Sequence, residues 1–143
     1  MPISPKPNSI IIHVAGSGTG AIKLLLVMIS IHLLIGFSFK LALKAAYMSL
    51  GGDSEMLTRF NHDLTKTLQA ARKRGFAFGD KRLEMLIDAL RNTHADHYFR
   101  YGTAPTVLLP TFQETLPMLQ ELVVDVCREG KARMIITNGS ITQ

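Results

Sequence analysis

The sequence DKRLEMLIDALRNTHADHYFRYG, residues 80–102, joins a regular apolar repeat to a run of chemically active side chains. Asp80 stands where the N-cap of a helix is expected. The apolar residues that follow recur at i, i+3, i+4 and i+7, as on one face of an α-helix: Leu83, Leu86, Ile87 and Leu90. His94 continues this face if the helix lasts one more turn. The stretch therefore predicts a core helix that leads into a polar segment.

That polar segment, residues 91–102, holds the candidate site. It contains two histidines, two arginines and two tyrosines within twelve residues. Arg91, His94 and His97 are three residues apart in turn, so a continuing helix would bring them together at one end of a helical bundle. A structural role is the alternative, with Arg100 stacking on a tyrosine and His94 bonding a carbonyl at a helix end.

Composition restricts the classes of protein that remain. A chain of 143 residues can bury one core but not two. Its formal net charge of +5 permits a polyanionic partner such as RNA, although only 19% of residues are charged and no long basic run occurs. The single cysteine, Cys127, excludes an internal disulfide and a cysteine-rich zinc site. Its apolar helical surroundings predict a buried structural thiol in a cytoplasmic protein.

A zinc site is disfavoured for a second reason. His94, Asp96 and His97 have helical spacing, but they offer only three ligands, and the sequence has no second cluster to complete a structural site. No metal ligand is therefore assigned.

The first twenty residues are expected to form an extended or disordered leader, because three prolines fall within the first seven positions. Residues 10–14 have strand character, and GSGTGA at 16–21 matches the G-x-G-x-x-[GA] turn of dinucleotide-binding proteins. That turn binds a pyrophosphate only within a βαβ unit that has an acidic residue about 20 positions on. No acidic residue precedes Asp53 and no second buried strand is expected, so a glycine-rich leader is favoured.

Residues 24–39 are the most hydrophobic part of the chain. Sixteen residues rise about 24 Å as a helix, which is less than the roughly 30 Å of a bilayer's hydrocarbon core. We therefore expect a central helix buried on most sides, with a membrane span as the alternative. His32 within it is expected to be a core histidine bonded to a backbone group.

Two more helices follow from the spacing of apolar residues. From Lys40 the chain becomes amphipathic, with Leu41, Leu43 and Tyr47 turning around the axis before Gly51 and Gly52 stop the helix. A short polar connection is expected at residues 53–55. The next helix opens within residues 61–64, where Asp63 or Asn61 can cap it, buries Leu64, Leu68 and Ala71, and ends at Gly75.

The C-terminal part is expected to hold a loop, one helix and a tail. Residues 103–110 predict a loop bounded by prolines, and the last helix runs from Pro110 to Gly130, bent or delayed by Pro117. Residues 131–143 are expected to be a frayed tail. Residues 21–130 are thus predicted to form an all-α, antiparallel up-down bundle of four to five helices.

Three segments, in this order, resemble the HEPN family of small helical bundles. They are FKLALKAAY at 39–47, NHDLTKTLQAA at 61–71 and the segment 91–102. The family typically shows an E-L-x-L-K-A helix, a G-H-D-L helix start, and an R-x(4 to 6)-H or R-Y loop before the last helix. Lys40 stands where the family usually has glutamate, and Asn61 where it has glycine. The resemblance covers about residues 37–128.

Many HEPN proteins are metal-independent ribonucleases of toxin and antiphage systems that act as dimers. The resemblance implies a homodimer here, with Arg91, Asn92 and His97 as an R-N-x(4)-H catalytic motif. His97 would take the proton of an RNA 2′-hydroxyl, Arg91 would offset the charge on the phosphate, and Asn92 would orient it. The expected product is a 2′,3′-cyclic phosphate, formed without a metal or other cofactor.

A non-catalytic HEPN module is the alternative. It would bind RNA, a nucleotide or a partner such as a nucleotidyltransferase-type antitoxin. The binding residues would be His94, Tyr98, Arg100 and Tyr101, together with the basic cluster Arg72, Lys73 and Arg74 at a helix end, which otherwise is only a solvated terminus. A small protein anchored in the membrane through residues 24–39 is a third interpretation.

Overall fold

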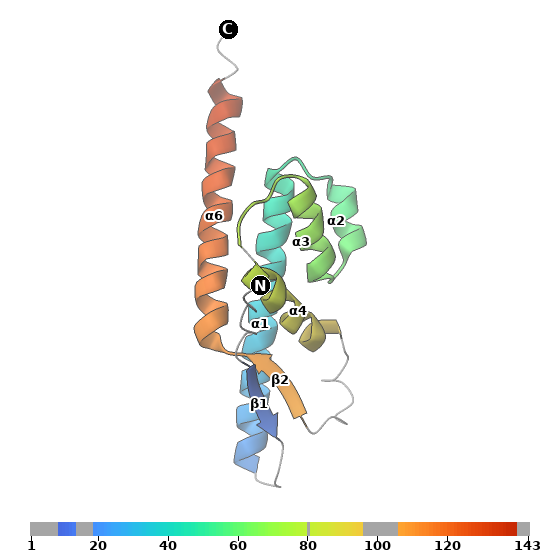
Figure 1. Cartoon of the computed structure of the whole chain (residues 1–143), viewed down its shortest axis with the longest axis vertical. Coiled ribbons are helices and arrows are strands. Elements are labelled where there is room, and N and C mark those ends of the chain that lie inside the picture. The colour runs from blue at the N-terminus through green and yellow to red at the C-terminus, as the bar shows by residue number, and fades with distance from the viewer. Residues whose placement is uncertain (1–8, 14–18, 80, 96–105, 140–143) are drawn as a thin grey trace, which may run out of the picture.

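The computed structural model describes residues 9–13, 19–79, 81–95 and 106–139. In this part the chain forms five helices and one two-stranded ribbon (Figure 1). In order, the elements are β1 (Ser9–His13), α1 (Thr19–Ser49), α2 (Ser54–Phe60), α3 (Leu64–Lys73), α4 (Lys81–Ala95), β2 (Thr106–Pro110) and α6 (Phe112–Gly139). The predicted all-α class is confirmed, and the ribbon is an addition to it. The predicted antiparallel up-down arrangement is not confirmed.

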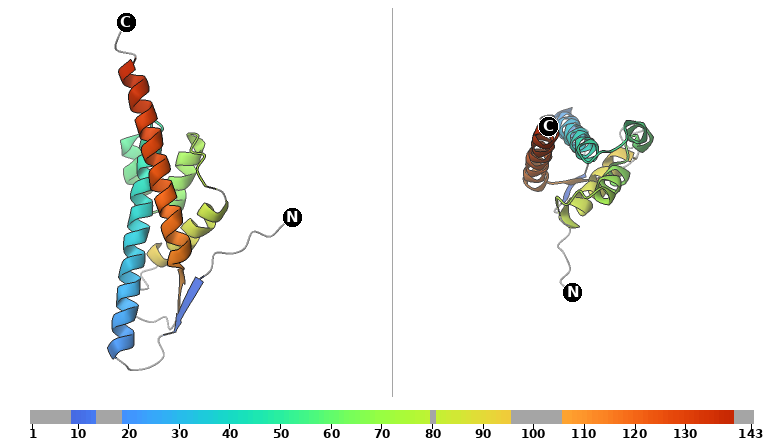
Figure 2. Two further views of the ribbon diagram at one scale, coloured as in Figure 1. Left: turned by 90° about the vertical axis from the view of Figure 1, so that its left-hand side faces the viewer. Right: turned by 90° about the horizontal axis from the view of Figure 1, so that it is seen from above.

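Helices α1 and α6 form the long axis of the molecule. They lie side by side and run in the same direction, and α3 also packs on α1 (Figures 1 and 2). The first turns of α1 extend past the start of α6, beside the ribbon. Helix α4 contacts α1, α3 and β2, so it closes the core between the helices and the ribbon.

Helix α1 is one continuous helix of 31 residues, about 46 Å long. One face of it is core: Ile35, Phe39, Leu43 and Tyr47 are each at most 5% exposed. The expectation that residues 24–39 are buried on most sides is wrong, because the opposite face of the helix stays outside the bundle. Leu34 lies on that outer face and is 66% exposed.

The same helix meets the length and composition of a membrane span. Its segment Leu26–Ser49 has a mean hydropathy of 2.0, and 28% of the window is buried inside the structure. The core helix of a soluble protein or a segment near an N-terminus passes the same test. The feature alone therefore assigns no location.

The predicted core helix is confirmed. In α4 the side chains of Leu83, Leu86, Ile87 and Leu90 are at most 3% exposed. They pack in one cluster with the predicted buried face of α3, with the core face of α1 and with Leu122 of α6. Each fully buried leucine contributes about 1.5–3 kcal/mol relative to an exposed one, so this cluster stabilises the bundle.

Local capping sets where α3 begins and ends. The carboxylate of Asp63 accepts a hydrogen bond from the backbone N–H of Lys66 at 3.0 Å, which confirms Asp63 as the N-cap. Gly75 follows the helix with φ of +95°, a conformation that glycine adopts without a Cβ clash. Gly51 ends α1 in the same way, with φ of +76°.

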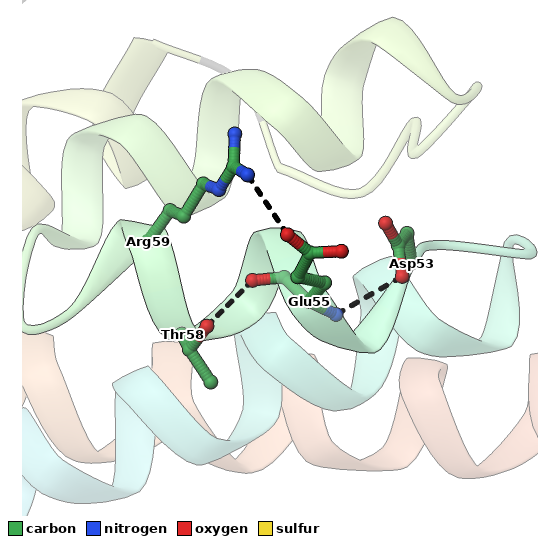
Figure 3. A network of polar contacts seen from close by, with 4 residues as sticks. All are labelled: Asp53, Glu55, Thr58 and Arg59. Atoms are coloured by element: carbon green, nitrogen blue, oxygen red, sulfur yellow. Dashed lines mark hydrogen bonds and ion pairs between the residues drawn. The ribbon is translucent and has the colours of Figure 1, made fainter.

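The polar connection expected after Gly52 is instead the short helix α2. Asp53 caps it by accepting from the N–H of Glu55 at 3.0 Å, and the hydroxyl of Thr58 donates to the carbonyl of Glu55 at 2.6 Å (Figure 3). Arg59 forms an ion pair with the Glu55 carboxylate at 2.8 Å, one turn away. None of the residues of α2 is buried, so α2 lacks the apolar periodicity that marks the other helices in the sequence.

The ribbon corrects two predictions. β1 and β2 pair antiparallel, with Ser9 opposite Pro110 and His13 opposite Thr106. Residues 106–110, expected in a loop, therefore form a strand, and the predicted leader contributes the other one. The strand character expected at residues 10–14 is confirmed by β1, but its partner was not evident because the two strands lie far apart in the sequence. An antiparallel partner is also not the parallel βαβ unit that a dinucleotide fingerprint requires.

Helix α6 is longer than predicted. Gly130 does not end it, and residues 131–139 are helical rather than a tail. Pro117 lies inside the helix, within its first two turns. Cys127 is exposed, so the prediction of a buried thiol is wrong: it lies on the solvent side of a helix whose core residue is Leu122.

Candidate functional site

A shallow groove of about 470 Å³ lies where α1, α2 and α3 meet. Tyr47 of α1 and Met56 and Phe60 of α2 form its apolar wall. The polar rim comes from one edge of α3 and the residue after it: Lys66, Gln69, Lys73 and Arg74. We call this surface the α3 groove.

The helical repeat of α3 places its cations on the groove. Lys66, Gln69 and Lys73 are separated by three and four residues, so they lie along one stripe of the helix. The core residues of α3, Leu64 and Leu68 among them, occupy the opposite face. Lys66 also lies 3.7 Å from the Asp63 carboxylate, but this exposed pair contributes little and leaves the ammonium accessible.

Arg74 is held over the wall of the groove. Its guanidinium carbon lies 5.0 Å from the centroid of the Tyr47 ring, and its Nη1 donates to the carbonyl of Gly51 at 2.7 Å. The ring of Tyr47 in turn meets Phe60 edge-on at 5.4 Å, and its hydroxyl accepts from the N–H of Asp53 at 3.3 Å. Arg74 is thus a positioned planar cation rather than a freely moving one.

Arg72 has a different role from its two basic neighbours. It donates to the carbonyls of Phe76, Phe78 and Gly79 at 3.1, 2.6 and 2.9 Å, and lies 5.6 Å above the Phe76 ring. These contacts fix the loop between α3 and α4. Of the basic cluster 72–74, only Lys73 and Arg74 line the groove.

A second pair of polar side chains lies on the edge of α1. Nζ of Lys40 donates to Nδ1 of His62 at 2.8 Å. Burial lowers the pKa of Lys40 below its ordinary value of 10.5, and the charge of Lys44 lowers it further. Lys40 is the residue that replaces the glutamate of the HEPN pattern, and His62 is the histidine of the G-H-D-L-like start. Two of the three segments that carry the resemblance, 39–47 and 61–71, therefore meet in space, which the sequence did not reveal.

The predicted catalytic segment is described only at its beginning. Helix α4 continues through Ala95, so the extra turn that the sequence predicted beyond Leu90 is present, and Arg91 is exposed on it. The side chains of Asn92 and His94 lie outside the described residues. The remaining predicted catalytic and binding residues also lie entirely outside the described residues: His97, Tyr98, Arg100 and Tyr101. The same is true of Asp96, a candidate ligand of the disfavoured zinc site.

Part of the α3 groove was predictable from sequence. The predicted basic cluster contains Lys73 and Arg74 but not Lys66 and Gln69, although their spacing from Lys73 places them on the same stripe. The wall formed by Tyr47, Met56 and Phe60 was not predicted, because α2 was not expected.

Comparisons with protein-family models, curated proteins and solved structures find no match for this chain. The interpretation of its function therefore rests on its own residues and geometry.

Proposed function

We propose that this chain is an HEPN-like helical module that binds RNA through the α3 groove. The observation that carries the proposal is the stripe of Lys66, Gln69 and Lys73 beside the positioned guanidinium of Arg74. Lysine and arginine side chains bind the phosphates of a nucleic acid and release its counterions. An arginine plane also stacks on unpaired bases, and single strands expose them.

The surroundings of the groove fit a single-stranded ligand. The wall of Tyr47 and Phe60 is apolar, and the groove is open rather than enclosed, so a flexible strand could lie along it. The net charge of +5 adds a weak, long-range attraction for any polyanion. A homodimer and pairing with a nucleotidyltransferase-type antitoxin belong to the same proposal and rest on the resemblance. A cytoplasmic location also belongs to it and rests on the single cysteine.

Binding of a fluorescent single-stranded RNA, measured as anisotropy over a series of salt concentrations, tests the proposal. The variant with Lys66→Gln and Lys73→Gln removes two exposed cations and should bind more weakly, with the slope of log K against log salt reduced by about 1.4. Arg128→Gln with Lys131→Gln removes the same charge from exposed positions of α6 and is the matched control. If the two double variants lose RNA affinity equally, the loss is an effect of net charge, and the proposal that RNA binds in the α3 groove is rejected.

A metal-independent ribonuclease is the second candidate. It is favoured by the persistence of α4 to Ala95 with Arg91 exposed at its end, where a phosphate could reach the guanidinium. The resemblance supplies His97 as the base and Asn92 as the orienting group. Cleavage of RNA in EDTA that produces 2′,3′-cyclic phosphate ends, and that is lost in His97→Ala and Arg91→Ala, would establish it. Binding without cleavage by the folded wild type would leave the module as an RNA-binding protein.

A further inference from the structure

The outer face of α1 carries a regular apolar stripe that the bundle does not cover. Its large members are separated by alternating steps of three and four residues, or by a whole heptad. They are Leu24 (64% exposed), Val27 (55%), Ile31 (38%), Leu34 (66%), Leu41 (67%) and Met48 (42%). We call this stripe the α1 seam.

The seam follows a period of 3.5 residues rather than 3.6. Six of the eight a and d positions from Leu24 to Met48 carry a large apolar side chain, and the other two are Ser38 and Ala45. Sustained a/d spacing over about three heptads is the pattern of helices that pack along one another in a left-handed supercoil.

The polar group on the seam is already bonded. The hydroxyl of Ser38 donates to the carbonyl of Leu34 at 2.9 Å, within the helix. Covering the seam would therefore leave this donor satisfied, and no charged side chain occupies an a or d position.

The exposed apolar area of the seam is large enough for a small dimer interface. Side chains of this size and exposure each leave on the order of 100 Å² of apolar surface, so the seam offers roughly 600 Å² per chain. Two copies packed through it would remove on the order of 1,200 Å², the lower end of the range for specific interfaces. A two-fold pair is the simplest arrangement, since the same stripe is then complementary to itself.

A bilayer is a poorer occupant of this face. In a spanning helix, Lys40 and Lys44 would lie within the apolar window, at a cost of about 2.5–3.5 kcal/mol each near its centre. The other face of α1 carries Phe39 and Leu43, both 0% exposed, so insertion would have to open the core.

We propose that the α1 seam is the contact surface between two copies of this chain. The interface is independent of the α3 groove, and it is formed by α1. Its occupant is a second copy of this protein, in micromolar equilibrium with the monomer.

Sedimentation equilibrium of the full chain across the micromolar range tests this. We expect the wild type to dimerise, and Leu34→Lys and Leu41→Lys, at two of the most exposed positions of the seam, to shift it to monomer. Leu116→Lys, at a leucine of α6 that is 49% exposed, is the matched control and should dimerise like the wild type. Circular dichroism confirms that each variant is folded.

A gain-of-function variant keeps the test independent of folding defects. Ser38→Leu completes the seam and should tighten the dimer by about tenfold or more. A wild type that stays monomeric, including one that instead floats with phosphatidylglycerol vesicles, would overturn the proposal. So would lysine variants with an unchanged Kd, or a Ser38→Leu variant that gains no affinity.

Discussion

Nε2 of His32 lies 2.9 Å from the carbonyl oxygen of Pro110, a residue 78 positions further along the chain. Nδ1 of the same ring lies 2.7 Å from the carbonyl of Met28, and the ring packs at 4.6 Å from that of Phe112. His32 is only 2% exposed. The predicted core histidine with a backbone partner is thus confirmed, and it joins α1 to the point where β2 passes into α6.

Replacing His32 by alanine should destabilise the fold by about 2–4 kcal/mol. The substitution leaves a cavity beside Phe112 and removes the ring nitrogen that faces the buried carbonyl of Pro110. Urea unfolding followed by circular dichroism measures the loss. Ser30→Ala, which removes an exposed hydroxyl bonded within the same helix at 2.8 Å, is the control and should stay within about 0.5 kcal/mol. A similar small effect at His32 would contradict its role as a link.

Gly79 should not tolerate a side chain. Its φ is +77°, and a Cβ built there would lie 2.7 Å from Cδ2 and 2.8 Å from Cβ of the buried Leu83. Gly79→Ala should therefore cost about 1–3 kcal/mol through backbone strain and overpacking. Gly130→Ala provides a control of opposite sign, because a Cβ there meets nothing within 4 Å in mid-helix and should add about 0.5–1 kcal/mol. Equal effects at the two glycines would refute the steric argument.

Arg72 and Lys73 are adjacent, yet their substitution should separate stability from binding. Arg72→Lys keeps the charge but loses the planar fork that reaches three carbonyls, so the free energy of unfolding should fall by about 1–3 kcal/mol. Protease digestion of the loop 75–79 should become faster. Lys73→Ala should instead weaken RNA binding and change the free energy of unfolding by no more than about 0.5 kcal/mol. A reversed pattern would exchange the roles assigned to the two residues.

Lys40 should destabilise the protein at neutral pH. Its pKa is lowered in the folded state, mainly by burial, so the unfolded chain binds more protons between the lowered value and 10.5. Stability then rises with pH through this window, because deprotonation removes a charge that is partly desolvated in the folded state. Lys40→Met should be more stable than the wild type at neutral pH, and the difference should shrink as the pH approaches 10.5. Its exposed contact with His62 contributes too little to reverse the sign. A stability difference that does not change with pH would show that the charge of Lys40 is not its cause.

The helices that bury one face were predictable from sequence. Leu83 to Leu90 have the spacing of a core helix, and Asp63 and Gly75 are suitable cap residues, because these signals act within one or two turns. Helix α2 lacks a buried face, and the ribbon depends on a partner about a hundred residues away. Local sequence signals therefore did not predict α2, and the strand character of residues 10–14 did not identify its partner strand.

The candidate site likewise has one part that was predictable from local sequence and another that depends on the tertiary structure. The cations of α3 follow from helical spacing, but the wall formed by Tyr47 and Phe60 depends on how α2 folds back. The contact of Lys40 with His62 joins two motifs that are 22 residues apart, so it exists only in the tertiary structure. The exposure of α1 was mispredicted because hydrophobicity along a helix does not say which of its faces the rest of the chain can reach.

The pairing of Ser9 with Pro110 has a consequence for synthesis of the chain. A ribosome adding about 5–20 residues per second needs roughly 5–20 s to make the partner of β1 after β1 itself. During this time the run Ile10-Ile11-Ile12 has no partner strand, and an apolar strand with open edges is prone to associate with other chains. Closing so long a loop is also entropically slow, so the ribbon should be the last element to form and the first to open.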